Sequence, residues 1–277
     1  MNNGFILTEK NGLRFYQMPS FNATGLVVHG FTTRSGGFSE SPYASLNTAL
    51  NIGDQSDRVL ANRTKVCEAL GVDPASLVTG QQVHGDTVRF VTTADRGRGA
   101  KAYSDALPET DALVTNAAET PLASFYADCV PVFLLDPVSR AVALVHAGWK
   151  GTAAKISLKT VREMKERFGA IPSNCLAGIG PSIGPCCYEI DEKVAVYFRE
   201  GFPLSSVLNN APQPGKWFLN LWLANLMILL EAGLRSENIA LAGLCTACGK
   251  DEFFSYRAGE GITGRMCSLI MLKRGQV

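Results

Sequence analysis

Five short runs of apolar residues do most to constrain how this chain folds. Each run is rich in Val, Leu or Ala and is bounded by Gly, Pro, Asp or Ser. Runs of this length with such boundaries predict strands buried on both faces. They cover residues 111–115 (DALVT), 131–135 (PVFLL), 141–146 (AVALVH), 175–179 (CLAGI) and 239–244 (IALAGL).

Helical periodicity separates these runs. Residues 57–70 place apolar side chains on one face before Gly71, and residues 152–168 do the same before Gly169. Two more helices are expected over 191–199 and over the apolar segment 218–234. Long connections without a steady β-α-β rhythm favour an α+β fold, a layered αβ sandwich with mixed sheets flanked by helices, over a doubly wound sheet.

Domain organisation follows from length and composition. A chain of 277 residues with 46% hydrophobic content buries a substantial core, and no composition break marks a boundary. We therefore expect a single domain over residues 1–277. Residues 95–107, dense in Gly and charge, are predicted to form a mobile loop near a site.

Charge and hydropathy restrict the partners. Lys and Arg total 26 against 25 Asp and Glu, a net charge of +1, which lacks the basic excess that binds nucleic acid. The segment 218–234 is interrupted by Asn220, Asn225 and Glu231, so no membrane span is expected. The first twenty residues lack the pattern of a secretion signal, and we expect a cytoplasmic protein.

Two of the three histidines, His84 and His146, lie where a predicted strand gives way to a glycine-containing loop, and Cys129 precedes another apolar run. Two imidazoles and a thiolate suit Zn²⁺ or copper, and three protein ligands leave a position for water or substrate. The spacing matches no compact zinc signature. A hydrogen-bonded structural histidine and a buried apolar cysteine are the alternative interpretations.

Seven blocks in one order resemble the laccase-domain family, whose members have been called polyphenol oxidases and purine nucleoside phosphorylases. The similarity runs from about residue 29 to about residue 270. The blocks are 29–39 (HGFTTRSGGFS), 82–85 (QVHG), 111–115 (DALVT), 127–131 (ADCVP), 145–151 (VHAGWKG), 180–188 (GPSIGPCCY) and 253–266 (FFSYRAGEGITGRM).

This resemblance implies one Zn²⁺ or copper ion on His84, Cys129 and His146 within a single αβ domain. It also implies phosphorolysis of adenosine, inosine, guanosine and methylthioadenosine to the free base and ribose 1-phosphate. Adenosine deaminase activity is expected as well, because a metal with an open position produces hydroxide near neutral pH, and attack on C6 of adenine expels ammonia.

Phosphorolysis requires a pocket for phosphate. Arg34, in a Thr-Arg-Ser-Gly-Gly turn, is the first candidate, followed by Lys150 and Arg257, with solvated surface charge as the alternative for each. The family commonly has Arg at the position of Lys150 and a second basic residue where this chain has Ala258. Lysine cannot form the paired hydrogen bonds that an arginine guanidinium makes to an anion. The contribution of each basic residue to phosphate binding therefore stays open.

Other candidate site residues are polar neighbours of these motifs. Asp128 is a candidate to position a water or accept a proton, or else to cap a turn, and His29 is a second candidate proton-transfer group. Asn47 and Gln82 are candidates to orient a base or sugar.

The remaining cysteine motifs predict structural roles. Cys245 and Cys248 form a lone CxxC, interpreted as structural or as lining the pocket. Vicinal Cys186 and Cys187 are interpreted as a tight packed turn, with oxidation or adventitious binding of soft metals as the alternative.

Two other enzyme classes use the same atoms. A metal-free cysteine hydrolase would take Cys129 as nucleophile and His84 or His146 as base. A copper oxidase of phenols is disfavoured because three ligands make one mononuclear site, whereas four-electron reduction of O₂ normally needs several coppers. A non-catalytic binding protein is a further alternative, although it would have no use for an open coordination position.

Overall fold

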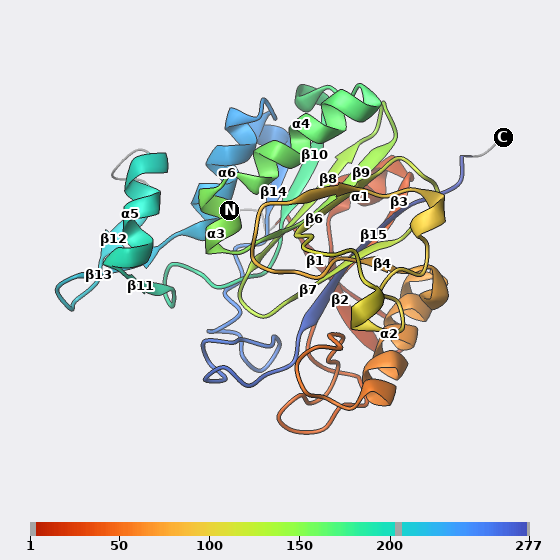
Figure 1. Cartoon of the computed structure of the whole chain (residues 1–277), viewed down its shortest axis with the longest axis horizontal. Coiled ribbons are helices and arrows are strands. Elements are labelled where there is room, and N and C mark those ends of the chain that lie inside the picture. The colour runs from red at the N-terminus through yellow and green to blue at the C-terminus, as the bar shows by residue number, and fades with distance from the viewer. Residues whose placement is uncertain (1–3, 203–206, 276–277) are drawn as a thin grey trace.

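The computed structural model describes residues 4–202 and 207–275. Two six-stranded mixed sheets stack face to face, and helices cover the outer face of each (Figure 1). The order of layers is helix, sheet, sheet, helix, which confirms the predicted α+β sandwich. Three buried clusters fill the three spaces between the layers.

The first sheet contains all five strands predicted from the sequence. Its central strands β8 and β9 are antiparallel and buried at every residue. In β8, Val132 and Leu134 pack toward the helices, while Phe133 and Leu135 pack toward the second sheet. Burial on both faces explains why these runs are apolar without alternation. The order is β14 (Ile239–Leu241), β10 (Leu176–Ile179), β8 (Val130–Asp136), β9 (Ala141–Ala147), β6 (Ala112–Thr115) and β5 (Val88–Phe90).

The second sheet was not predicted. It brings the first strands of the chain beside the last one, since β15 pairs with β3 on one side and with β7 on the other. The order is β1 (Ile6–Lys10), β2 (Leu13–Gln17), β3 (Val27–Thr32), β15 (Met266–Leu272), β7 (Leu122–Tyr126) and β4 (Val78–Thr79).

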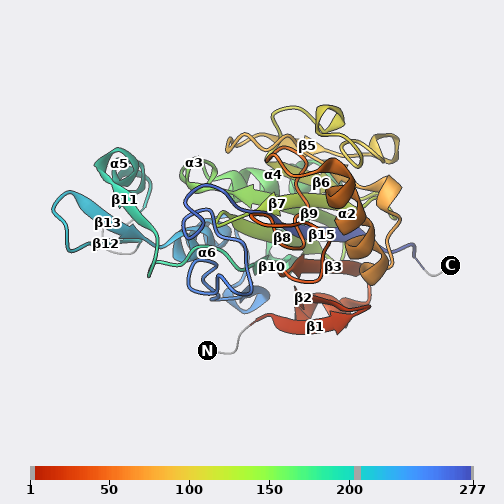
Figure 2. The ribbon, with the colours of Figure 1, turned by 90° about the horizontal axis from the view of Figure 1, so that it is seen from below.

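A small antiparallel sheet and α5 (Glu192–Gly201) stand out at one end of the molecule (Figure 2). The order of this sheet is β11 (Glu189–Asp191), β13 (Lys216–Leu219) and β12 (Leu208–Asn210). The predicted helix over 191–199 corresponds to α5, which begins where the Asp191 side chain accepts a hydrogen bond from the Val194 N–H group.

The helices flank the two large sheets. α1 (Pro19–Thr24) lies beside β3, and α2 (Ser56–Leu70) covers the second sheet. The helix predicted over 57–70 is thus confirmed, and it ends at Gly71, whose φ of 71° is left-handed.

The helix predicted over 152–168 is in fact two helices, α3 (Trp149–Ala153) and α4 (Ile156–Phe168). Lys155 lies between them with a left-handed φ of 56°, and the N–H groups of Ala154 and Lys155 close the last turn of α3. The break lets α3 contact α5 and α6 while α4 lies over β9 and β6.

The apolar helix is shorter than predicted. α6 spans Leu221–Glu231, because Asn220 caps it by accepting a hydrogen bond from the Leu223 N–H group. Phe218 instead belongs to β13, where it pairs with Glu189 and Asn209. Among residues 4–202 and 207–275, no helix is long and apolar enough to cross a membrane.

The loop over 95–107 is braced by hydrogen bonds. The buried Arg63 guanidinium donates to the carbonyl oxygens of Gly99 and Ala100 at 2.7 and 2.9 Å. Tyr103 in this loop lines the cavity described below, so the loop does lie beside the candidate site. Its mobility stays a prediction.

Candidate metal centre

Three distant segments bring His84, Cys129 and His146 together. Their ligand atoms all lie within 4.8 Å of one another, and the two imidazole centroids are 4.9 Å apart. His146 is in β9, opposite Pro131 of β8, and Cys129 immediately precedes β8. His84 lies in the loop between β4 and β5 rather than at a strand end, and its φ of 59° is left-handed.

The backbone passes close to this cluster at Gly148. A Cβ there would lie 3.2 Å from both the Cys129 sulfur and Cδ2 of His84. Glycine thus permits the approach that brings the loop after β9 against both side chains.

Asp111 orients two of the three residues, although its place in the sequence predicted no site role. Its buried carboxylate lies 2.8 Å from Nδ1 of His146 and accepts hydrogen bonds from the N–H groups of His84 and Gly85 at 3.0 and 2.8 Å. When Nδ1 of His146 donates to this carboxylate, Nε2 is left with a lone pair for a metal ion. Asp111 therefore fixes both the tautomer of His146 and the path of the loop that carries His84.

The site also favours the ionised thiol. Burial disfavours the Cys129 thiolate, but His146 and His84 reverse this effect and lower the pKa of Cys129 to about 6. Burial likewise opposes protonation of His146, whereas Cys129 and Asp111 raise its pKa above the ordinary value. A metal cation would take the place of the shared proton, because thiolate and neutral imidazole are the ligand forms. The donor set therefore fits one Zn²⁺ or copper ion.

A cavity of about 540 Å³ opens beside the three residues. Its size suits a small organic molecule. Besides the trio, the lining includes the aromatic side chains Tyr103, Phe125, Trp149, Tyr188 and Tyr256, and the two cations Arg257 and Arg265.

Three of the other predicted site residues also line this cavity: Gln82, Asp128 and Arg257. The Gln82 amide is paired with the backbone of Phe125 at 2.9 Å in both directions. The Asp128 carboxylate accepts hydrogen bonds from the Thr246 hydroxyl and the Arg257 N–H group at 2.6 and 2.7 Å, so it joins two distant segments instead of capping its own turn.

Arg34 and Lys150, two of the residues predicted to bind phosphate, do not line the cavity. The Arg34 guanidinium donates to the carbonyl oxygens of Ala44 and Lys250, so it ties two loops together. Lys150 points elsewhere on α3, with its Nζ 5.6 Å from the centre of the Trp149 ring, and lines a separate hollow.

His29 and Asn47 are fully buried, and neither is among the residues that line the cavity. Nε2 of His29 accepts a hydrogen bond from the Met18 N–H group at 2.8 Å, and its ring lies beside Phe21. The Asn47 amide donates to Asp54 and accepts from the Arg265 N–H group. Both side chains make contacts in the interior of the protein rather than at the surface of the cavity.

Arg265 and the tyrosines of the lining were not predicted. Nη1 of Arg265 donates to the carbonyl oxygens of Thr263 and Gly264, and burial lowers its pKa. Its position beside β15 in a motif that resembles the laccase-domain family was a usable signal, because the motif block 253–266 also supplies Tyr256 and Arg257.

Comparison with known proteins matches residues 28–273 to the family model described as multi-copper polyphenol oxidoreductase laccase. The chain is 42% identical over 248 residues to "Purine nucleoside phosphorylase YlmD" of Bacillus subtilis (strain 168), covering 89% of each chain. It is 34% identical over 239 residues to "Adenosine deaminase RL5" of an unknown prokaryotic organism, covering 84% of this chain and 91% of that one.

Among solved structures, the hypothetical protein YfiH of Bacillus licheniformis superposes with a TM-score of 0.92 at 39% identity. The match covers 98% of this chain and 100% of that chain. The layered arrangement of sheets and helices is therefore shared along the whole length.

Proposed function

Because this chain belongs to the family of the multi-copper polyphenol oxidoreductase laccase model, in which relatives are named purine nucleoside phosphorylases, we propose that it is a metal-dependent purine nucleoside phosphorylase. In this reaction a phosphate oxygen bonds to C1′ of the ribose while the C1′–N9 bond breaks. The electron pair stays with the purine, which takes up a proton. The substrates we propose are adenosine, inosine, guanosine and methylthioadenosine.

The convergence of His84, Cys129 and His146 beside the cavity is the observation that carries this proposal. These three residues would hold one Zn²⁺, with copper as the other ion that suits the donor set. When bound, such an ion supplies a Lewis acid with an open coordination position. Asp111 would hold His146 in the tautomer that leaves Nε2 free for this ion.

The cavity walls suit the two substrates. Aromatic side chains such as Tyr188 and Tyr256 offer faces against which a purine stacks. Arg257 donates to the carbonyl oxygens of Cys187 and Glu189 at 3.0 Å each, and a guanidinium has five N–H donors, so donors remain for an anion. We therefore assign phosphate to Arg257 and Arg265 instead of Arg34.

Incubating the purified protein with inosine or adenosine, with and without phosphate, and separating the products by chromatography tests this function. Phosphate-dependent release of hypoxanthine or adenine with equal amounts of ribose 1-phosphate is the expected result. Absence of base release from every proposed nucleoside, in protein that carries its metal, would contradict it.

Adenosine deamination is the second proposed activity. It is supported by the similarity to "Adenosine deaminase RL5" and by the same metal trio, since zinc deaminases use a metal-activated water at C6. In the same chromatographic assay, deamination appears as inosine formed from adenosine without phosphate.

A cysteine hydrolase remains the competing proposal, because Cys129, His146 and Asp111 form a nucleophile, base and orienting group without any metal. The metal content of active protein distinguishes the metal-dependent phosphorylase from the cysteine hydrolase. Activity that survives complete removal of metal, and that is lost on alkylation of Cys129, would favour the hydrolase.

A further inference from the structure

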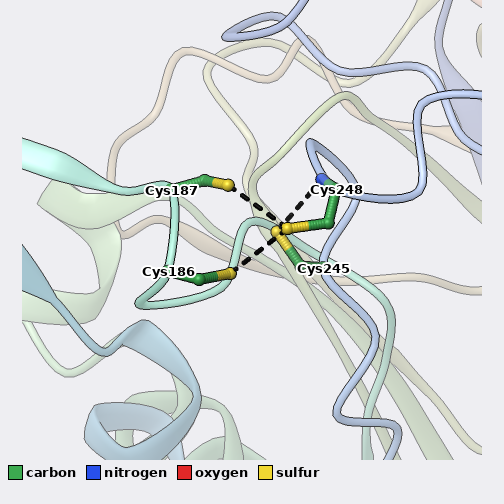
Figure 3. Close-up of side chains that lie close together, drawn as sticks. All are labelled: Cys186, Cys187, Cys245 and Cys248. Carbon is green, nitrogen blue, oxygen red and sulfur yellow. Dashed lines mark hydrogen bonds between the residues drawn. The ribbon is translucent and has the colours of Figure 1, made fainter.

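Four cysteines from two loops converge at a second place (Figure 3). Cys186 and Cys187 lie in the loop between β10 and β11, and Cys245 and Cys248 lie in the loop after β14. Their sulfur atoms all lie within 4.8 Å of one another. The vicinal pair supplies the second pair of thiols that a lone CxxC lacks for a zinc site.

Two of the sulfur–sulfur distances suit a shared metal ion better than a disulfide. Cys248 Sγ lies 3.5 Å from Cys186 Sγ and 3.4 Å from Cys187 Sγ. A disulfide requires about 2.05 Å between sulfurs. In a tetrahedron with zinc–sulfur bonds of about 2.3 Å, the sulfurs lie about 3.8 Å apart.

Backbone N–H groups already point at one of these sulfurs. Cys245 Sγ accepts hydrogen bonds from the N–H groups of Gly184 and Cys248 at 3.2 and 3.5 Å. Such donors around a ligand stabilise thiolate and fix its orientation. A Cβ on Gly184 would lie 2.8 Å from the Trp222 ring and 3.1 Å from Cβ of Cys245, so glycine allows the two loops to come this close.

We propose that Cys186, Cys187, Cys245 and Cys248 bind a structural Zn²⁺ that joins these two loops. This ion is separate from the one proposed for His84, Cys129 and His146. Four protein thiolates complete a tetrahedral site and leave no open position, which is the pattern of a structural rather than a catalytic zinc. Cys186 and Cys248 are exposed, so an ion has access from solvent.

A zinc ion at this site would fix one wall of the cavity beside His84, Cys129 and His146. The first loop continues into Tyr188 and the second leads to Tyr256 and Arg257, all of which line the cavity. The loops also meet through the hydrogen bond from the Thr246 N–H group to the Ser182 carbonyl oxygen. A zinc ion beside this contact would hold both loops in register.

Zinc content per chain tests the proposal in the full-length protein, purified anaerobically with reductant and loaded with zinc. Wild-type protein is expected to hold two zinc ions. The Cys245→Ser/Cys248→Ser double variant and the Cys129→Ala variant are each expected to hold one. Cys67→Ala, which removes a buried thiol of α2 outside both clusters, serves as the matched control and is expected to hold two.

Cobalt substitution and diffraction give readouts that do not depend on the variants folding. Cobalt bound to wild-type protein should show the absorption of a tetrahedral four-thiolate site. Anomalous scattering at the zinc edge should place a peak between the four sulfurs. Equal zinc content in wild type and in the folded double variant, no anomalous peak at the cluster, or a disulfide found there by peptide mapping would each overturn the proposal.

Discussion

Asp111 shows what a single residue contributes to this site. Its carboxylate contacts the His146 ring and the backbone of the loop that carries His84, so it couples two candidate metal ligands that are far apart in sequence. Burial opposes its ionisation, but His146 and the N–H groups of Gly85 and Val83 keep the pKa of Asp111 below its ordinary value. The sequence does not reveal this role, because an Asp before an apolar run is equally typical of a strand boundary.

Asp111→Asn is expected to weaken metal binding by about 10-fold to 100-fold, because partners of metal-bound histidines contribute that much to affinity. Competition with a chromophoric chelator measures the change. Asp136→Asn is the matched control, because Asp136 is also buried but accepts hydrogen bonds from Val138 and Ser139 at the far end of β8. Equal affinities for both variants would contradict the role of Asp111.

The burial of His29 predicts how the stability of the protein changes with pH. Burial lowers its pKa to about 4, against about 6.5 in an unfolded chain. The unfolded chain therefore binds the proton first, and the free energy of unfolding falls as the pH drops from about 6.5 toward about 4. The full effect of this one group is about 3 kcal/mol.

His29→Gln removes this titration while keeping an acceptor for the Met18 N–H group. In urea unfolding, its loss of stability between pH 7 and pH 4.5 should be smaller than that of the wild type by about 2 to 3 kcal/mol. Parallel stability curves for the two proteins would show that His29 does not titrate in this way.

Arg257 and Arg34 were both predicted to bind phosphate, but only Arg257 lines the cavity. Arg257→Met is expected to raise the KM for phosphate by about 10-fold to 100-fold, with a smaller change for inosine, because a hydrogen bond to a charged group contributes about 1.5 to 3 kcal/mol. Arg34→Met is the comparison. It should lower stability through loss of the contacts to Ala44 and Lys250 but change the KM for phosphate by less than about twofold. A larger increase in the KM for phosphate in Arg34→Met than in Arg257→Met would instead identify Arg34 as the phosphate ligand.

At the scale of elements, continuous apolar runs were predictable and short or one-sided strands were not. Runs such as 131–135 and 141–146 became β8 and β9 because burial on both faces demands apolar residues throughout. β4 and β5 contain two and three residues, too few for any period to show, and most of β1 is exposed. β15 is fully buried and apolar, so its signal was present in the sequence and was missed.

Lys155 explains why periodicity merged α3 and α4 into one helix, since a single left-handed residue leaves the apolar pattern on both sides intact. Lys155→Gly is expected to raise the free energy of unfolding by up to about 1 kcal/mol, because glycine adopts a left-handed φ without steric cost. This gain exceeds the loss of the exposed ion pair between Lys155 and Glu231, since surface ion pairs contribute little. Arg162→Gly, in the exposed interior of α4, should lower it by about 1 kcal/mol. If both substitutions lowered the free energy of unfolding in chemical denaturation, the helix break at Lys155 would be contradicted.

At the scale of the whole molecule, the site exists only because the two sheets are stacked. His84 and Cys129 lie in connections between strands of different sheets, and His146 lies in β9 of the first sheet. The core between the sheets takes side chains from both ends and the middle of the chain, including Phe5, Phe133 and Ile270. For this reason we propose that residues 1–277 form one domain. The spacing of His84, Cys129 and His146 along the sequence does not indicate that they converge. The motifs that resemble the family do indicate it.

The most direct measurement of the central claim is the rate of inosine phosphorolysis by wild-type and Cys129→Ala protein, with the metal content of each sample determined in parallel. We predict that Cys129→Ala loses one metal ion per chain and at least about 100-fold of the rate, because removing a ligand costs no less than removing its supporting partner. Full metal content together with full turnover in Cys129→Ala would contradict the account.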